Sequence, residues 1–182
     1  DTENNTFDGI SGNDTVDYSD NINNAYVEIN LSSSSTTING KILVANKAVT
    51  NSTIIDTDTL YNIENINGTI YSDIIVGNES NNILNGNAGN DILRGGAGND
   101  TLIGGTGIDT LTYSESYNKD VTVNLATSKI TDLSGIFSNM DGFVGDSGQT
   151  NTLTGANTSN TWTVTGVGTG DINGKSFTNF KN

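Results

Sequence analysis

The sequence contains no cysteine, no histidine and no proline in 182 residues. Without cysteine the chain has no disulfides, no thiolate zinc sites and no thiol nucleophile. Without histidine it lacks the commonest general base, the commonest metal ligand and every catalytic triad that contains an imidazole. A catalyst would need a serine–lysine or carboxylate pair, and metal binding accounts for most of the acidic residues. We therefore expect that this chain is not an enzyme.

Basic residues are scarce as well, because 7 Lys and Arg face 21 Asp and Glu, for a formal net charge of -14. A surface of this sign repels nucleic-acid phosphates and anionic lipid headgroups. No segment approaches the ~20 apolar residues of a membrane span. The composition predicts no nucleic-acid partner and no membrane insertion, and it favours bound cations and a location outside the cell.

The centre of the chain is a nonapeptide repeat, in which Gly68, Gly77, Gly86, Gly95 and Gly104 are spaced nine residues apart. The five units are GTIYSDIIV, GNESNNILN, GNAGNDILR, GGAGNDTLI and GGTGIDTLT, which together cover residues 68–112. Two positions of each unit keep their chemistry. The sixth is Asp73, Asn82, Asp91, Asp100 and Asp109, and the eighth is Ile75, Leu84, Leu93, Leu102 and Leu111.

This spacing predicts an all-β parallel roll, or solenoid, in which each unit forms half of a coil. A strand of about three residues holds one inward aliphatic side chain, and a glycine-rich hexapeptide then reverses the chain. So short a strand is stable only when coils stack on one another. Residues 18 apart then lie above one another, so Asp73, Asp91 and Asp109 form one column and Asn82 and Asp100 another.

Stacked carboxylates would repel each other across the ~5 Å between strands. A divalent cation between the turns removes this conflict. Carboxylate and carbonyl oxygens, with no imidazole or thiolate, favour calcium over zinc or copper. We expect about three to five calcium ions from the number of neighbouring turns.

The units resemble the glycine-rich nonapeptide G-G-x-G-x-D-x-U-x of the RTX (repeats-in-toxin) calcium-binding β-roll. The match is complete in GGAGNDTLI and GGTGIDTLT and degraded in the first two units. The resemblance implies a right-handed parallel β-roll that folds on extracellular calcium after type I secretion from a bacterium. It also implies that the sixth-position Asp and the carbonyl oxygens of the turn hold the ion.

Carried over to this sequence, the implied side-chain ligands are Asp73, Asp91, Asp100 and Asp109, with Asn82 as a weaker site because its side chain is neutral. The implied carbonyl ligands are those of Gly86, Ala88, Gly95, Gly96, Ala97, Gly98, Gly104, Gly105, Thr106 and Gly107, with Thr69 and Tyr71 as further candidates. Upstream, Asn62-Ile63-Glu64-Asn65 resembles the entry to the repeats in the C-terminal domain of serralysin-type proteases. There the Glu binds calcium, so Glu64 and Asn62 are candidates too, the alternative for Glu64 being a solvated acid.

The repeat has β-rich flanks that we expect to cap the roll. Residues 1–67 form an N-terminal capping segment in which GISGNDTVDYSD is one isolated repeat-like turn, with Asp14 as a candidate ligand. YVEINL at 26–31 follows it as a strand, and the same order recurs at 109–125, which indicates a duplication. SSSSTTING is expected to be a polar loop, and Asp56 and Asp58 either a chelating pair or part of a hydrated turn.

Residues 113–182 are expected to form a C-terminal β-rich segment of degenerate repeats. DLSGIFSNM at 132–140 is the one place that favours a helical turn, and TWTVT at 161–165 predicts a half-buried strand. Trp162 is either a core or cap residue or a sugar platform. The threonine-rich face is explained by sheet propensity, with glycan or ice binding as the alternative.

Three functions are compatible with these features. The first is a non-catalytic calcium-binding module of a secreted or cell-surface bacterial protein, an adhesin or S-layer component, whose partners are calcium and other copies or domains of a larger surface protein. The second is the non-catalytic C-terminal domain of a secreted protease, lipase or polysaccharide epimerase. The third is a glycan- or ice-binding module.

Overall fold

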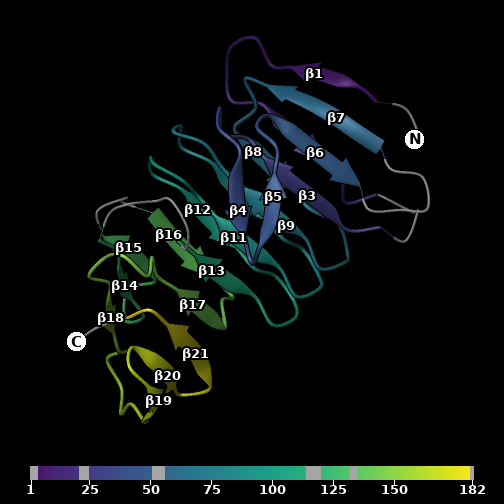
Figure 1. The fold of residues 1–182 in the computed structure, drawn as a ribbon. Helices are drawn as coiled ribbons and strands as arrows, with labels where there is room; N and C mark the ends of the chain where they lie inside the picture. Colours follow the sequence, from purple (N-terminus) through teal and green to yellow (C-terminus); the bar gives the residue numbers. More distant parts are fainter. Residues whose placement is uncertain (1–3, 21–24, 51–55, 114–119, 132–134, 181–182) are drawn as a thin grey trace.

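The computed structural model describes residues 4–20, 25–50, 56–113, 120–131 and 135–180. Their regular secondary structure consists of β-strands, and none of these residues forms a helix that could cross a membrane. The strands form two large sheets that face each other, with one hairpin outside them (Figure 1). The predicted all-β parallel roll is confirmed.

The larger sheet has eleven strands in the order β1 (Thr6–Asp8), β7 (Asp56–Tyr61), β6 (Lys47–Thr50), β3 (Val27–Asn30), β9 (Ile74–Val76), β11 (Ile92–Arg94), β13 (Thr110–Thr112), β17 (Gly142–Val144), β21 (Lys175–Thr178), β20 (Thr169–Ile172) and β19 (Trp162–Gly166). The smaller sheet has eight, in the order β18 (Thr152–Thr154), β14 (Thr122–Asn124), β15 (Lys129–Thr131), β16 (Gly135–Ser138), β12 (Thr101–Ile103), β10 (Ile83–Asn85), β8 (Asn65–Asn67) and β2 (Thr15–Asp17).

The repeat region alternates between the two sheets, one strand per nonapeptide. In the smaller sheet Leu84 pairs with Ile66 and Leu102, and in the larger sheet Leu93 pairs with Ile75 and Leu111, all in parallel register. These partners are 18 residues apart, as the period predicts. The six aliphatic side chains are fully buried between the sheets, where they form the middle of one continuous core.

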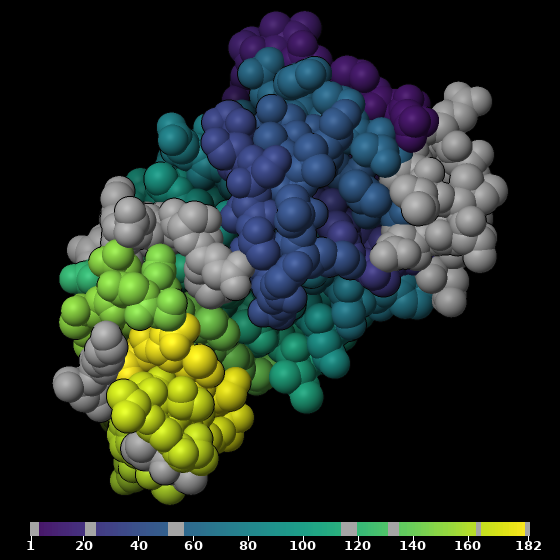
Figure 2. All heavy atoms as spheres, in the orientation of Figure 1, coloured from purple at the N-terminus to yellow at the C-terminus, as the bar shows by residue number. Residues whose placement is uncertain are grey.

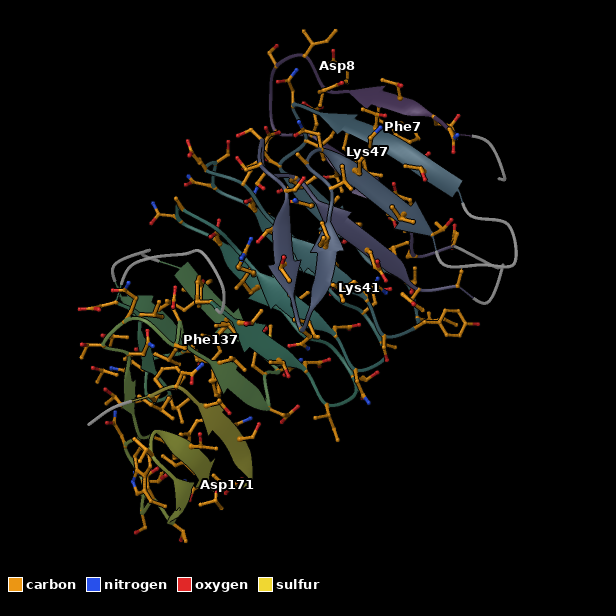
Figure 3. The ribbon with its side chains drawn as sticks, in the orientation of Figure 1. Phe7, Asp8, Lys41, Lys47, Phe137 and Asp171 are labelled. Carbon is orange, nitrogen blue, oxygen red and sulfur yellow. The ribbon has the colours of Figure 1, made fainter. Side chains whose placement is uncertain are left out.

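The core continues into both flanking segments. Val27, Ile29 and Leu31 extend it on the N-terminal side, where Ile29 pairs with Ile75. Phe137 and Phe143 extend it on the C-terminal side, with ring centroids 5.4 Å apart in an edge-to-face arrangement. Figure 3 shows Phe7 and Asp8 of β1 at one end of the molecule and Asp171 of β20 at the other.

Two local predictions were wrong. Residues 135–138, expected in a helical turn, form β16, because Ile136 and Phe137 pair with Thr101 and Leu102 of the roll; residues 132–134 of that prediction lie outside the described ranges. The polar loop expected at 32–40 contains β4 (Thr36–Ile38), which forms a hairpin with β5 (Lys41–Leu43).

The β4–β5 hairpin covers the outer face of the larger sheet. Ile38 and Leu43 pack on Val76, and Arg94 Nη2 donates a hydrogen bond of 2.8 Å to Thr36 Oγ1. In the space-filling view the blue atoms of this region lie over the teal atoms of the roll, whereas the yellow-green C-terminal residues form a lobe beside it (Figure 2). Side chains on the outer face of the roll therefore form a second, smaller hydrophobic core with the hairpin.

Candidate metal centre

The sixth residues of the repeats form two columns, one along each edge of the roll. In one column the Asp73 N–H donates to Asp91 Oδ1 at 2.8 Å, and the Asp91 N–H donates to Asp109 Oδ1 at 2.9 Å. In the other, the Asn82 N–H donates to Asp100 Oδ1 at 2.9 Å. One oxygen of each of these three carboxylates therefore holds the preceding coil in register.

The second oxygen of the same carboxylates is left over. Asp91, Asp100 and Asp109 are at most 2% exposed, and their Oδ2 atoms are buried with no hydrogen-bond partner among the residues that the structure describes. A buried acceptor without a donor costs free energy unless a proton or a cation satisfies it. These three oxygens are the clearest sign that the turns bind something positive.

Burial changes the acidity of the columns. Desolvation is the main reason that the pKa of Asp91 is raised to about 8, and the negative charges of Asp73 and Asp109 also raise it. The hydrogen bond from the Asp73 N–H acts in the opposite direction and lowers this pKa. Desolvation likewise raises the pKa of Asp100 to about 6, and that of Asp109 above its ordinary value. Without a counter-ion the folded roll therefore disfavours the ionised form of its own aspartates.

Glycine at the first position of each unit brings these oxygens close to the backbone. A Cβ on Gly104 would lie 2.6 Å from Asp109 Oδ2, and one on Gly86 would lie 2.7 Å from the Gly104 carbonyl oxygen as well as against Asp91 Oδ2. Any larger residue would displace them. The carboxylate of one turn and the carbonyl of the next thus meet over a glycine, and both are oxygen ligands of the kind that calcium takes.

The predicted carbonyl ligands lie in the turns that connect the two sheets. In these turns Gly105 and Gly107 have φ values of 107° and 135°, which residues with a side chain rarely adopt. Successive turns are tied to each other, since the Thr106 N–H donates to the Asn87 carbonyl at 2.9 Å and the Thr106 carbonyl accepts from Gly89 at 3.0 Å. Among the described residues no three acidic side chains converge, so a metal would need these carbonyls.

Two of the sixth-position residues satisfy their own turns. Asp73 Oδ2 accepts from the Thr69 N–H at 2.6 Å, while Asp73 Oδ1 accepts from the Val27 N–H and the Thr69 hydroxyl, each at 2.8 Å. The carboxamide of Asn82 donates from Nδ2 to the Glu64 carbonyl at 2.8 Å and accepts the Asn78 N–H at 2.9 Å. These are the degraded units of the sequence. Their turns are closed by hydrogen bonds within the protein.

Asp14 and Glu64 lie next to each other, although 50 residues separate them in the sequence. Val16 pairs with Ile66, and the Asp14 N–H donates to Glu64 Oε2 at 3.0 Å. Asp14 Oδ2 is buried without a partner among the described atoms, like those of the repeat aspartates. The N-terminal turn is isolated in the sequence, yet it stacks in register on the first strand of the roll.

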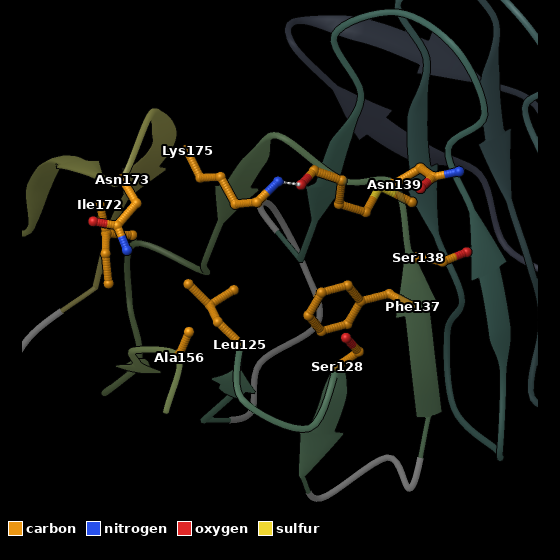
Figure 4. Close-up of a pocket in the computed structure, with 10 residues that line it drawn as sticks. Leu125, Ser128, Phe137, Ser138, Asn139, Ala156, Ile172, Asn173 and Lys175 are labelled. Carbon is orange, nitrogen blue, oxygen red and sulfur yellow. Dashed lines mark hydrogen bonds between the residues drawn. The ribbon is translucent and has the colours of Figure 1, made fainter. Parts of the chain in front are cut away.

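Sequence reasoning missed Asp141 and Lys175, which continue the first column past Asp109. The Asp109 N–H donates to Asp141 Oδ2 at 3.3 Å, and Lys175 Nζ lies 3.3 Å from Asp141 Oδ1. Lys175 Nζ also donates a hydrogen bond to the Met140 carbonyl (Figure 4). The two aspartates are 32 positions apart, which is not a multiple of the nine-residue period, so the repeat does not predict their contact. The signal that remains is Asp141-Gly142-Phe143, which repeats the Asp-x-aliphatic pattern with an aromatic residue.

Both carboxylate oxygens of Asp58 accept hydrogen bonds within the protein. Asp58 is buried in β7, where Oδ2 accepts from the Tyr18 hydroxyl and Oδ1 from the Asn5 N–H, each at 3.0 Å. The expected hydrated turn at Asp56 and Asp58 is therefore a strand. Trp162 packs edge-to-face on Phe177 with centroids 5.8 Å apart and stays partly exposed, so its side chain supports the core near the edge of the sheet.

Comparison with known proteins agrees with the geometry. No curated protein matches the chain. Residues 62–93 and 76–111 match the family of the RTX calcium-binding nonapeptide repeat. The matched region covers both columns of sixth-position residues, the glycine-rich turns and the short turn that contains Glu64. RTX repeats form calcium-binding β-rolls and occur in secreted bacterial proteins. Residues 62–111 of this chain are therefore RTX calcium-binding nonapeptide repeats.

Proposed function

We propose that the chain is a non-catalytic module of an adhesin or S-layer protein on a bacterial surface, and that calcium drives its folding. The observation that carries the calcium-binding part of this proposal is the buried Oδ2 atoms of Asp91, Asp100 and Asp109, which have no hydrogen-bond partner among the described residues. Asp91 and Asp109 lie in one column and Asp100 in the other, and buried carboxylates of this kind fit hard divalent cations. The absence of histidine and cysteine from the sequence supports a structural role.

The coupling of calcium to folding follows from the burial of these groups. In the unfolded chain the carboxylates are hydrated, the ion has no preformed site, and the negative charges keep the chain open. In the roll Asp91, Asp100 and Asp109, with carbonyl oxygens of their turns, would hold separate ions, which supply the positive charge that the buried oxygens lack. The free energy of binding thereby becomes free energy of folding.

Far-UV circular dichroism with a thermal melt tests this proposal, first in excess EDTA and then in excess calcium. We expect a coil spectrum to become a β spectrum when calcium is added, together with a large rise in melting temperature. Magnesium at the same concentration is the control, because it demands a tighter octahedral site and should be far less effective. Identical β spectra and melts in EDTA and in calcium would contradict the proposal.

A further inference from the structure

Three times in the roll, a full glycine-rich turn stacks on a much shorter corner, and we call each such pair a junction. The full turns run over residues 9–14, 104–109 and 145–151. Their first glycines donate hydrogen bonds of 3.0–3.1 Å to the carbonyls of the residues just before the corners, Tyr61, Ser138 and Thr178. The three junctions therefore share this backbone hydrogen bond. The first two full turns also have positive φ at their second and fourth residues (Ile10, Gly12, Gly105 and Gly107), whereas the third turn is one residue longer and has no residue of positive φ.

The corners share a conformation and a sequence pattern. Each begins with an asparagine in the left-handed region, namely Asn62, Asn139 and Asn179 with φ values of 52°, 53° and 63°. Each asparagine is followed by a buried apolar side chain, Ile63, Met140 or Phe180. The carbonyl of the asparagine faces the full turn. What differs between the junctions is the side chain that meets it.

In the third junction this side chain is the amide of Asn151. Asn151 is fully buried, and its Nδ2 donates to the Asp146 carbonyl of its own turn at 2.7 Å and to the Asn179 carbonyl of the corner at 2.8 Å. Its Oδ1 accepts the Val121 N–H at 3.2 Å. The amide thus holds the preceding coil with its oxygen and closes the junction with its nitrogen, without any ion.

In the second junction the same place is taken by Asp109, whose Oδ1 likewise accepts a backbone N–H of the preceding coil. Where Asn151 presents a donor, Asp109 presents Oδ2, which is buried and lacks a partner among the described residues. A Cβ on Gly104 would meet both this oxygen and the Asn139 carbonyl oxygen. At the corresponding place a Cβ on Gly145 would meet Asn151 Nδ2, at 2.5 Å.

Two oxygens that can only accept hydrogen bonds therefore face each other at the second junction. An ionised carboxylate and a carbonyl have no hydrogen to share, so burying them together is unfavourable unless a cation lies between them or the carboxyl is protonated. The first junction has the same chemistry, since a Cβ on Gly9 would meet Asp14 Oδ2 and the Asn62 carbonyl oxygen. Asp14 Oδ2 also lacks a described partner.

We propose that the junctions Asp109–Asn139 and Asp14–Asn62 are binding sites for a hard divalent cation, and that Asn151–Asn179 is a junction of the same design that works without metal. This inference rests on the proposed calcium-binding function. At the place that faces the corner carbonyl the two forms differ in one atom, Oδ2 of the aspartates and Nδ2 of Asn151. A carboxylate oxygen requires the ion, and an amide nitrogen at the same place replaces it with two hydrogen bonds.

The test exchanges the two side chains and counts calcium ions by native mass spectrometry. Asn151→Asp should bind one more calcium than the unchanged chain and should need a higher calcium concentration to gain its β spectrum. Asp109→Asn should bind one fewer. Asn124→Asp is the control, because it makes the same chemical change at a site where the described partners of Oδ1 are the N–H groups of Ala126 and Thr127. Its calcium count should stay unchanged.

An unchanged count in both Asn151→Asp and Asp109→Asn would overturn the inference and would indicate a protonated carboxyl at the junction. That result is separable from a failure of the proposed function, in which the unchanged chain itself would bind no calcium. If Asn151→Asp does not fold in either condition, the count for Asp109→Asn decides alone.

Discussion

The backbone N–H of Asp73 donates a hydrogen bond of 2.8 Å to Oδ1 of Asp91, which comes 18 residues later in the sequence. Asp91 repeats the contact to Asp109 at 2.9 Å. Each of these carboxylates therefore has two tasks, because one oxygen fixes the coil before it and the other is available to a cation. Loss of one aspartate should affect both the register of the roll and its affinity for calcium.

Replacing two of these aspartates should weaken calcium binding strongly. We expect Asp100→Ala together with Asp109→Ala to lower the apparent calcium affinity by roughly 10-fold or more and to reduce cooperativity. The two changes remove one ligand from each of the two columns. Asp171→Ala is the control, since Asp171 lies in β20 and, among the described residues, the partner of its Oδ1 is the Gly174 N–H. Equal effects of the two changes in titration calorimetry would refute the assignment of the site.

The stability of the calcium-free roll should fall as the pH rises. Burial raises the pKa of Asp91 to about 8 and that of Asp100 to about 6. Since the folded pKa exceeds the unfolded one, the stabilisation is complete below the unfolded value of about 4 and is lost as the pH rises through about 6 to 8. Far-UV circular dichroism in EDTA at about pH 4 and about pH 9 measures this difference, and we expect the β spectrum to be lost at the higher pH.

Calcium should reverse this dependence, because the ion competes with protons for the same oxygens. In excess calcium we expect the melting temperature to rise between about pH 5 and about pH 8. A calcium affinity that does not change over this range would show that the buried aspartates are not the groups that bind the ion.

A methyl group on Gly104 should disrupt the roll. In Gly104→Ala the new Cβ would collide with the Asn139 carbonyl and Asp109 Oδ2, and we expect a loss of about 1–3 kcal/mol in the free energy of unfolding. Gly166→Ala is the matched control, because a Cβ there has no neighbour within 4 Å. Melts in excess calcium compare the two, and a similar small shift for both would contradict the packing argument.

Lys175 should contribute a small, salt-dependent stabilisation at the end of the first column. Lys175→Met removes the ion pair with Asp141 and the hydrogen bond to the Met140 carbonyl. Because both charged side chains are more than a third exposed, we expect a cost of at most about 1 kcal/mol that shrinks in high salt. Lys129→Met, at an exposed position of β15, serves as the control in the same melts, and equal shifts would argue against a role for the pair.

The regular part of the fold could be predicted because one period governs it. The nine-residue spacing places Leu84 beside Leu102 and Asp91 beside Asp109, and the structure confirms both pairings. Asp141 could not be found in this way. Its contact with Asp109 depends on where the intervening strands β14, β15 and β16 lie, and tertiary pairing rather than local sequence decides that.

The β4–β5 hairpin was missed for a different reason, since its signal was present in the sequence. Asn39-Gly40 separates two short runs of β-forming residues, and both residues have positive φ, as a tight hairpin turn requires. The preceding serines favoured a loop. What fixes the hairpin is the burial of Ile38 and Leu43 against Val76, an outward-facing residue of the roll. The nine-residue pattern specifies only the inward-facing positions, so it does not predict that contact.

The stacking of the roll determines how it would respond to tension. β1 lies at one end of the larger sheet and β19 at the other, so a force that draws the ends apart acts along the hydrogen bonds of the ladder. Such a load peels strands away one after another instead of shearing many bonds at once. Ions that bind between neighbouring turns would link adjacent coils along the direction of the force, and each would raise the force needed to separate two coils.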